Sequence, residues 1–263
     1  MKKNIALLAA LSLGAISAVA DDATTAPAAA TTTAPATAPV ALTQQSPLSF
    51  NSGMGYESKY LFQGIQYADS IITPSFNAFY GNWYAGTWFA IPIENEYHWS
   101  DEMDLYGGYN LKLNDLVTAD LGAIHFSYND CITGFLHPNN STEGYVGFNF
   151  NTLFKPNIYF ERDFDCLTYT IVAKASHSIP IIKDWSLDPS VLFGHMWEEK
   201  NYNTDYTFWG AKLDLTYTIK DGTTVAGGVR YNGSTERYYI GSAKDPSAQY
   251  NAFWYGIQFC TNF

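Results

Sequence analysis

The last twelve residues of the chain alternate between two kinds of side chain, and this alternation constrains the fold more than any other feature. Every second residue from Phe253 to the terminal Phe263 is apolar or aromatic, except Thr261. The residues between them, from Ala252 to Asn262, are mostly small or polar. A period of two places successive side chains on opposite faces of a β-strand. The segment therefore predicts a strand with one apolar face.

The same period recurs from Leu48 onward, between clusters of turn residues. It predicts twelve strands, at residues 48–63, 73–80, 83–93, 102–113, 116–128, 142–150, 153–161, 167–178, 185–197, 206–219, 223–232 and 250–263. Their connections alternate between short turns and longer loops, which is the arrangement of outer-membrane barrels. The sequence therefore predicts an all-β fold, a transmembrane antiparallel up-and-down β-barrel of about twelve strands with both chain ends on the short-turn side.

The composition favours a barrel in lipid over a soluble sheet. Aromatic residues make up 17% of the chain and charged residues only 15%. A transmembrane barrel uses aromatic girdles at both interfaces and an uncharged outer band. The alternative is a soluble secreted β-protein, which is expected to carry Thr, Ser and Lys on its exposed face. Here the polar face holds many Gly, Asn and Tyr residues instead.

The N-terminus predicts export from a bacterial cell. Lys2 and Lys3 precede an apolar run too short to span a bilayer, and Ala18-Val19-Ala20 supplies a cleavage site. We expect residues 1–20 to be a signal peptide and residues 21–46, rich in Ala, Thr and Pro, to be a disordered periplasmic linker. Residues 47–263 would then form the barrel in the bacterial outer membrane, surrounded by its lipid.

The charged residues on the expected strands fall on the polar phase, so none needs to face lipid. They number eight acidic and six basic residues, which predicts a charged but nearly balanced interior. Such groups either pair across a narrow bore and partly close it, or line a wet pore. The candidate lumen-lining residues are Glu57, Lys59, Trp88, Glu102, Asp104, Tyr106, Lys112, Glu143, Lys174, Lys212, Asp214 and Arg230.

The connections expected to be long are acidic, with twelve carboxylate residues against Arg162, Lys200, Arg237 and Lys244. An acidic mouth concentrates cations, so we expect a mild cation preference. Cys131 and Cys166 fall in neighbouring loops of this side and are candidates for a disulfide. The formal net charge of −11 argues against nucleic acid as a partner.

No motif predicts an enzyme, a cofactor or a metal site. The five His residues are scattered, and no phosphate loop, dinucleotide fingerprint or nucleophile elbow occurs. A hydrolytic triad assembled from separate strands remains open, because spacing along the sequence cannot exclude it.

Several stretches resemble the TorF-type porin family of bacterial outer-membrane β-barrels. They are Ser58-Lys59-Tyr60-Leu61-Phe62-Gln63-Gly64-Ile65 followed by Asp69, then Tyr84-Ala85-Gly86-Thr87-Trp88, and Glu102-Met103-Asp104-Leu105-Tyr106-Gly107-Gly108-Tyr109. The family usually has Arg where this chain has Gln63, and a Pro in the fifth strand that is missing from Phe126-Ser127-Tyr128-Asn129. The final strand, with Phe259 and the terminal Phe263, also resembles the signal that the barrel-assembly machinery recognises.

These features predict a porin-like channel for passive passage of small solutes or ions. The resemblance implies an inward cluster of Glu57, Lys59, Trp88, Glu102, Asp104 and Tyr106 at one end of the lumen. The same cluster is equally consistent with a structural network that fixes strand register. A closed barrel with a structural or surface-interaction role is the alternative function.

Overall fold

The protein is an antiparallel β-barrel. The computed structural model describes residues 48–93, 101–128, 140–199, 205–220, 222–235 and 251–263. Within these ranges no helix is long and apolar enough to cross a bilayer. The barrel strands are β1 (Leu48–Glu57), β4 (Ile71–Tyr80), β5 (Trp83–Pro92), β6 (Glu102–Lys112), β7 (Val117–Tyr128), β8 (Asn140–Phe150), β9 (Asn157–Asp163), β10 (Thr168–Ser176), β12 (Trp185–Glu198), β13 (Tyr206–Lys220), β14 (Thr223–Ser234) and β15 (Asn251–Asn262).

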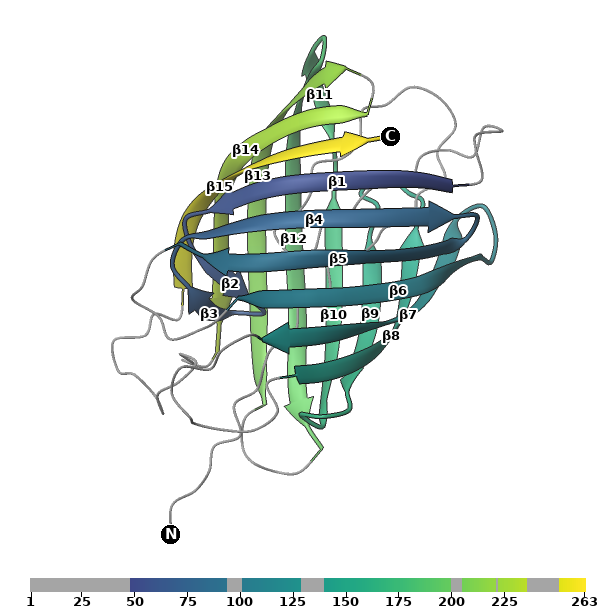
Figure 1. The fold of residues 1–263 in the computed structure, drawn as a ribbon, viewed down its shortest axis with the longest axis vertical. Helices are drawn as coiled ribbons and strands as arrows, with labels where there is room; N and C mark the ends of the chain where they lie inside the picture. The colour runs from purple at the N-terminus through teal and green to yellow at the C-terminus, as the bar shows by residue number, and fades with distance from the viewer. Residues whose placement is uncertain (1–47, 94–100, 129–139, 200–204, 221, 236–250) are drawn as a thin grey trace.

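The twelve strands form a closed ring (Figure 1). The first strand, β1, pairs with the last, β15, from Asn51 opposite Asn262 to Glu57 opposite Gly256. Every other barrel strand pairs with the barrel strands before and after it along the chain. A short strand, β11 (Ile179–Ile182), continues the line of β10 and pairs with the start of β12. The predicted twelve-stranded antiparallel barrel is confirmed.

The first strand is shorter than predicted. The alternation suggested a strand over residues 48–63, but β1 ends at Glu57 and the chain then bends. Two further strands, β2 (Tyr60–Phe62) and β3 (Ile65–Ala68), form a hairpin that pairs with no barrel strand. The period of two is the same in the hairpin as in the barrel wall, so the sequence pattern alone does not separate them.

The connections alternate in position, as predicted. One end of the barrel, here called the turn end, has the connections at 81–82, 113–116, 151–156, 183–184 and 221–222, together with the start of β1 and the end of β15. The opposite end, the loop end, has the connections that follow β1, β5, β7, β9, β12 and β14. Gly81 and Gly222 adopt positive φ angles of 57° and 74°, which glycine adopts without a steric penalty.

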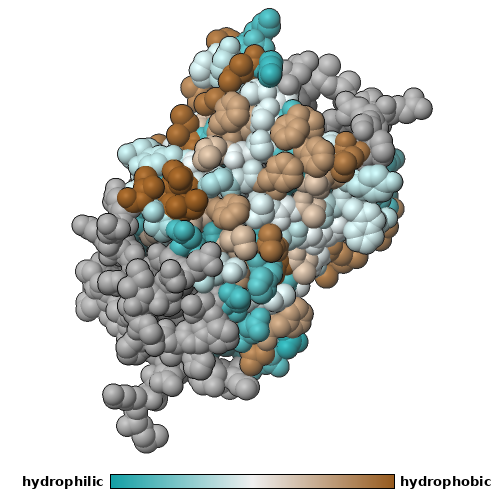
Figure 2. All heavy atoms as spheres, in the orientation of Figure 1, coloured by the Kyte–Doolittle hydropathy of each residue, from teal (hydrophilic) through white to brown (hydrophobic). Residues whose placement is uncertain are grey.

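The outer face of the barrel is apolar. Outward residues such as Phe193, Leu213 and Ile257 are between 41% and 58% exposed. The view in Figure 2 shows apolar side chains spread over the face formed by β1, β4 and β5. Aromatic pairs lie near the turn end, where the ring centroids of Trp185 and Tyr217 are 4.8 Å apart. This is the surface that a barrel needs against hydrocarbon.

Candidate functional site in the barrel lumen

The interior of the barrel is strongly acidic. Nine carboxylate side chains are buried there: Glu57, Glu102, Asp104, Asp120, Glu143, Glu161, Asp163, Asp188 and Asp214. Among the described residues only Lys212 and Arg230 are buried cations, and Lys174 is half-buried. The prediction of a nearly balanced lumen was therefore wrong.

Three lysines that were predicted to line the lumen account for most of the difference between the predicted and the observed charge. Lys59 lies in the bend after β1, and Lys155 lies in the turn between β8 and β9 with a φ of 39°. Lys112 is at a position of β6 whose side chains point inward. It is the last residue of that strand, however, and its side chain is 62% exposed at the turn end. Its ammonium group is 2.8 Å from Asp115 Oδ1, and this hydrogen bond and charge lower the pKa of Asp115. Lys112 is thus outside the enclosed lumen, and Lys59 lies beyond the end of β1.

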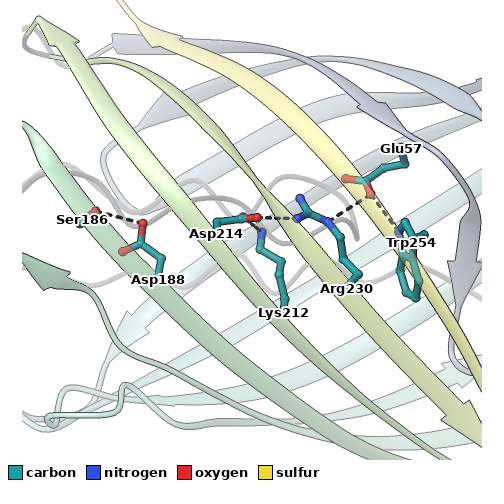
Figure 3. Close-up of polar contacts among 7 residues, drawn as sticks. All are labelled: Glu57, Ser186, Asp188, Lys212, Asp214, Arg230 and Trp254. Atoms are coloured by element: carbon teal, nitrogen blue, oxygen red, sulfur yellow. Dashed lines mark hydrogen bonds and ion pairs between the residues drawn. The ribbon is translucent and has the colours of Figure 1, made fainter. Parts of the chain in front are cut away.

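A network of buried ion pairs crosses one side of the wall (Figure 3). Arg230 on β14 has its Nε 3.1 Å from Glu57 Oε2 on β1, and its Nη1 donates to Asp214 on β13. Lys212 Nζ is 2.6 Å from the other oxygen of Asp214. Trp254 on β15 donates from its indole N–H to Glu57 Oε2 over 2.9 Å. The network therefore joins four neighbouring strands.

Glycine lets this network lie flat against the wall. A Cβ atom at Gly256 would be 2.2 Å from Glu57 Oε1, so any side chain there would displace the Glu57 carboxylate from its ion pair. A Cβ atom at Gly228 would be 2.6 Å from Asp214 Oδ1 and 2.0 Å from the carbonyl oxygen of Leu213. The carboxylates of Glu57 and Asp214 thus occupy the space that side chains would fill on β15 and β14.

An acidic cluster lies on the other side of the lumen. It consists of Glu102 and Asp104 on β6, Glu143 on β8, and Glu161 and Asp163 on β9. The negative charges of Glu161, Asp163 and Asp104 all act on Glu143, which is 1% exposed. Glu143 Oε1 has no hydrogen-bond partner among the described residues. Lys174 on β10 is the cation that acts on Glu161.

A tyrosine cluster occupies the lumen nearer the turn end. Tyr84 and Tyr159 donate to the two oxygens of Asp120 over 2.7 and 2.8 Å, and the hydroxyl groups of Tyr84 and Tyr145 contact each other. Tyr106 donates to Asn77 on β4. These contacts join β4 to β6, and join β5 to β7, β8 and β9, so this cluster stabilises the relative register of the strands.

The β2–β3 hairpin crosses the full width of the lumen. It leaves the wall after β1, and its tip residue Gln63 donates from Nε2 to Glu161 Oε2 on β9 over 3.3 Å. In the ring order, β9 is the strand halfway around the barrel from β1. On the way Tyr60 donates to Glu102 Oε2 over 3.0 Å. The hairpin is thus attached to the acidic cluster at two points.

The tip of the hairpin is a tight turn that touches the wall at β13 and β14. Gln63 and Gly64 have φ angles of 45° and 80°, the left-handed pair that two-residue hairpin turns require. A Cβ atom at Gly64 would be 2.6 Å from Ser234 Cβ on β14 and 2.9 Å from Phe208 Cβ on β13. Glycine is therefore needed at this position both for the backbone angle and for the close approach.

The hairpin fills the loop-end half of the lumen with apolar side chains. Tyr60, Phe62, Ile65 and Tyr67 are at most 7% exposed and belong to one buried cluster with wall residues of β5, β7 and β13. The ring centroids of Tyr60 and Trp88 are 5.8 Å apart. Asp104 and Asp214 on the wall have no exposed surface. The hairpin therefore packs inside the barrel against these wall strands.

The inward cluster implied by the resemblance is divided among three places. Trp88, Glu102 and Asp104 lie together under the hairpin, Glu57 lies in the ion-pair network, and Tyr106 lies deeper beside Asn77. Lys212, Asp214 and Arg230 are in contact, whereas Glu143 and Lys174 belong to the acidic side.

Sequence reasoning missed the hairpin residues and Asp163, and it named Tyr106 but not Tyr84, Tyr145 and Tyr159 of the tyrosine cluster. A signal for the hairpin was available, because Gln63-Gly64 separates two short apolar runs at the spacing of a two-residue turn.

The other sites predicted from the sequence lie partly outside the residues that the structure describes. Cys131 lies outside the described residues, so its bridge to Cys166 stays a prediction, as do the signal peptide and linker at residues 1–46. Phe259 and Phe263 are exposed on the outer face and at the chain end, and the Phe263 ring centroid is 5.9 Å from that of Phe50. Within the described ranges no group of three or more His, Cys, Asp or Glu side chains is arranged to hold a metal ion.

Solved structures of porins resemble this barrel. The KdgM porin matches with a TM-score of 0.51 and 11% identity over 80% of this chain and 98% of its own. A second KdgM porin structure, in complex with disordered oligogalacturonate, matches with a TM-score of 0.51 and 10% identity over the same shares. The NanC porin covers 81% of this chain and 98% of its own at 12% identity, with a TM-score of 0.49. The KdgM likeness shows that the barrel fold is shared.

Sequence comparison gives the family. No match was found among curated proteins. The profile of a bacterial family described as proteins of unknown function, Gcw_chp, matches residues 41–255. Because this match covers more than half of the sequence, the chain belongs to the Gcw_chp family of bacterial proteins.

Proposed function

We propose that the protein is a porin-like channel of the bacterial outer membrane, of the TorF type, in which the β2–β3 hairpin is an internal gate. The observation that carries the proposal is the hairpin itself. A wall of twelve strands encloses an interior of intermediate width, and one luminal hairpin occupies its loop-end half. The signal peptide, the assembly role of Phe259 and Phe263, and the small solutes or ions that pass belong to the same proposal.

The hairpin is attached in a way that allows it to leave. Its two strands pair only with each other, so no backbone ladder joins them to the wall. The side-chain hydrogen bonds of Tyr60 and Gln63 to wall carboxylates are each worth about 1.5–3 kcal/mol, as bonds to charged groups are. The buried apolar side chains of the hairpin also hold it in place, and lid openings of this kind take place on microsecond to second timescales. Withdrawal of the hairpin would open the path beside the acidic cluster.

The opened path is expected to prefer cations. The carboxylates of Glu102, Asp104, Glu143, Glu161 and Asp163 face one another in a low-dielectric interior with Lys174 as the nearby cation. A passing cation lowers the repulsion among them, whereas an anion increases it. The interior thus supports the same preference that the acidic loops predict.

Reversal potentials in a salt gradient test this preference. For the signal-free protein in a planar bilayer, we expect the sign that corresponds to cation flux. The double variant Glu143→Gln with Asp104→Asn should move the potential toward zero, because two of the charges are removed. Lys112→Gln, at the exposed turn end, is the control and should change the potential little. A potential that favours anions in the unmodified protein would contradict the preference.

Gln63→Arg should hold the gate closed more firmly. An Arg at this position places a guanidinium beside the Glu161 carboxylate, so the hydrogen bond from an uncharged amide becomes an ion pair in which donor and acceptor are both charged. We expect fewer openings per minute in single-channel records than for the unmodified protein. Gln63→Met has a similar length without a donor and should open more often. Equal opening rates for the three proteins would show that residue 63 does not hold the hairpin.

A second candidate function is a closed barrel that acts structurally or through its loops. The filled lumen favours it, because Asp104, Asp120 and Asp214 have no exposed surface in this conformation. This function requires that the hairpin never leaves the lumen, and conductance measurements distinguish the two.

A further inference from the structure

A charged side chain lies on the outward face of the barrel near the loop end. Arg162 falls between the inward residues Glu161 and Asp163 on β9. The sequence analysis predicted that Arg162 lies in a loop. Because β9 continues to Asp163, the Arg162 side chain is instead on the outer face of the strand. Its side chain is 39% exposed. An outward Arg is tolerated near a membrane interface, where the cost falls to about 0–1 kcal/mol.

Arg162 is supported by aromatic rings. Its guanidinium carbon is 4.9 Å from the ring centroid of Tyr169 and 5.6 Å from that of Phe164. The Tyr169 ring stacks on Trp197 of β12 at 5.8 Å, and Trp197 stacks on His195 at 5.9 Å. The platform therefore runs across β9, β10 and β12, which are adjacent strands (Figure 1).

The hydrogen-bond donors of the Arg162 guanidinium are only partly paired with acceptors of the protein. Its Nη2 donates to Glu199 Oε2 over 3.0 Å, and Glu199 is itself 43% exposed. The Nε donor is buried and has no acceptor among the described residues, so it is not itself open to the outside. An Arg carries five N–H donors in a planar fork that matches phosphate. His195 also faces outward, with Nδ1 3.0 Å or less from Thr207 Oγ1, which leaves its other nitrogen for a ligand.

We propose that this outward platform, formed by Phe164, Arg162, Tyr169, Trp197 and His195, binds the phosphate of a membrane lipid headgroup. The inference rests on the proposed membrane location. Aromatic rings and long cationic side chains are the residues that membrane interfaces favour, and here the guanidinium contacts two of the rings. Exposed ion pairs such as Arg162–Glu199 are weak, so an anionic phosphate competes for the same exposed N–H groups.

The test measures lipid-dependent stabilisation. The signal-free protein is inserted into phosphatidylcholine nanodiscs, alone or with lipid A, a glycolipid that carries two phosphates. The midpoint of heat unfolding is then read from the shift in gel migration. We expect lipid A to raise the midpoint of the unmodified protein, because a ligand that binds only the folded state stabilises it. Arg162→Gln should lose most of that rise.

The controls separate this inference from the proposed function. Lys112→Gln also removes an exposed, ion-paired cation, but at the turn end, and should keep the full rise. Inorganic phosphate at the same concentration should leave the midpoint unchanged. No rise with lipid A, an equal rise with free phosphate, or an Arg162→Gln variant that keeps the rise would overturn the headgroup site. A barrel that fails to insert into phosphatidylcholine at all would instead contradict the membrane location.

Discussion

Replacing the β2–β3 hairpin with a short Gly–Ser linker between Ser58 and Ser70 should turn a mostly closed barrel into an open channel. The hairpin contributes Tyr60, Phe62, Ile65 and Tyr67 to the buried cluster inside the wall. Without them the loop-end half of a twelve-stranded interior has too few side chains to fill it. We expect small-sugar uptake into proteoliposomes to rise by an order of magnitude or more.

A variant that keeps the hairpin serves as the control for this experiment. Tyr60→Phe with Gln63→Met removes the two bonds to the wall carboxylates but retains the apolar side chains. Its uptake should lie between those of the unmodified and the shortened proteins. Both variants are first checked for heat-dependent gel migration, which reports a folded barrel. A folded, shortened barrel that takes up no sugar would show that the hairpin does not close the path.

Arg230→Met should lower the free energy of unfolding by about 3–5 kcal/mol, the usual cost of removing one partner from a buried ion pair. The change leaves Glu57 without its ion pair and leaves Asp214 with Lys212 alone. Both carboxylates remain buried, so their charges are no longer compensated. Urea-induced unfolding in lipid vesicles, followed by tryptophan fluorescence, measures the loss.

A double variant separates the loss of charge balance from the loss of packing. Arg230→Met with Glu57→Gln removes both charges of one pair and should recover part of the stability that Arg230→Met loses. Glu57→Gln alone should also destabilise, because Arg230 then has only Asp214. If the double variant is as unstable as the sum of the two single variants, the pair is not coupled and the network does not stabilise the wall.

The barrel itself could be predicted because its signal is repeated. Each strand needs the same alternation, since one face meets lipid and the other the lumen, and twelve repeats reduce the effect of any error in one strand. The turns added independent information, as Gly81 and Gly222 show by their positive φ angles. The C-terminal strand was predicted almost to the residue, from Asn251 to Asn262.

The arrangement inside the barrel could not be predicted in the same way. Whether Tyr60 and Phe62 continue a wall strand or fold inward depends on the backbone bend after Glu57, which the alternation does not report. A shift of two residues at the end of β9 moved Asp163 into the lumen and Arg162 onto the outer face. Strand ends are the least reliable part of a sequence-based prediction, and here they change the charge of the lumen.

The contacts that organise the lumen join residues far apart in the chain. Trp254 and Glu57 are 197 positions apart, and Gln63 and Glu161 are 98 positions apart. The alternation along a strand predicts that each of these side chains points into the barrel. Which of them contact one another depends on the order of the strands around the barrel, which the alternation does not give. For the same reason the sequence favoured one inward cluster, whereas the structure divides its members among three places.

Single-channel recording of the unmodified, signal-free protein in a planar bilayer tests the central claim most directly. A gated channel predicts a closed baseline with brief, discrete openings whose conductance rises with salt concentration. Folded barrels that insert, as heat-dependent gel migration of the recovered protein would show, but remain silent across the full voltage range would contradict a channel function and favour the closed structural barrel.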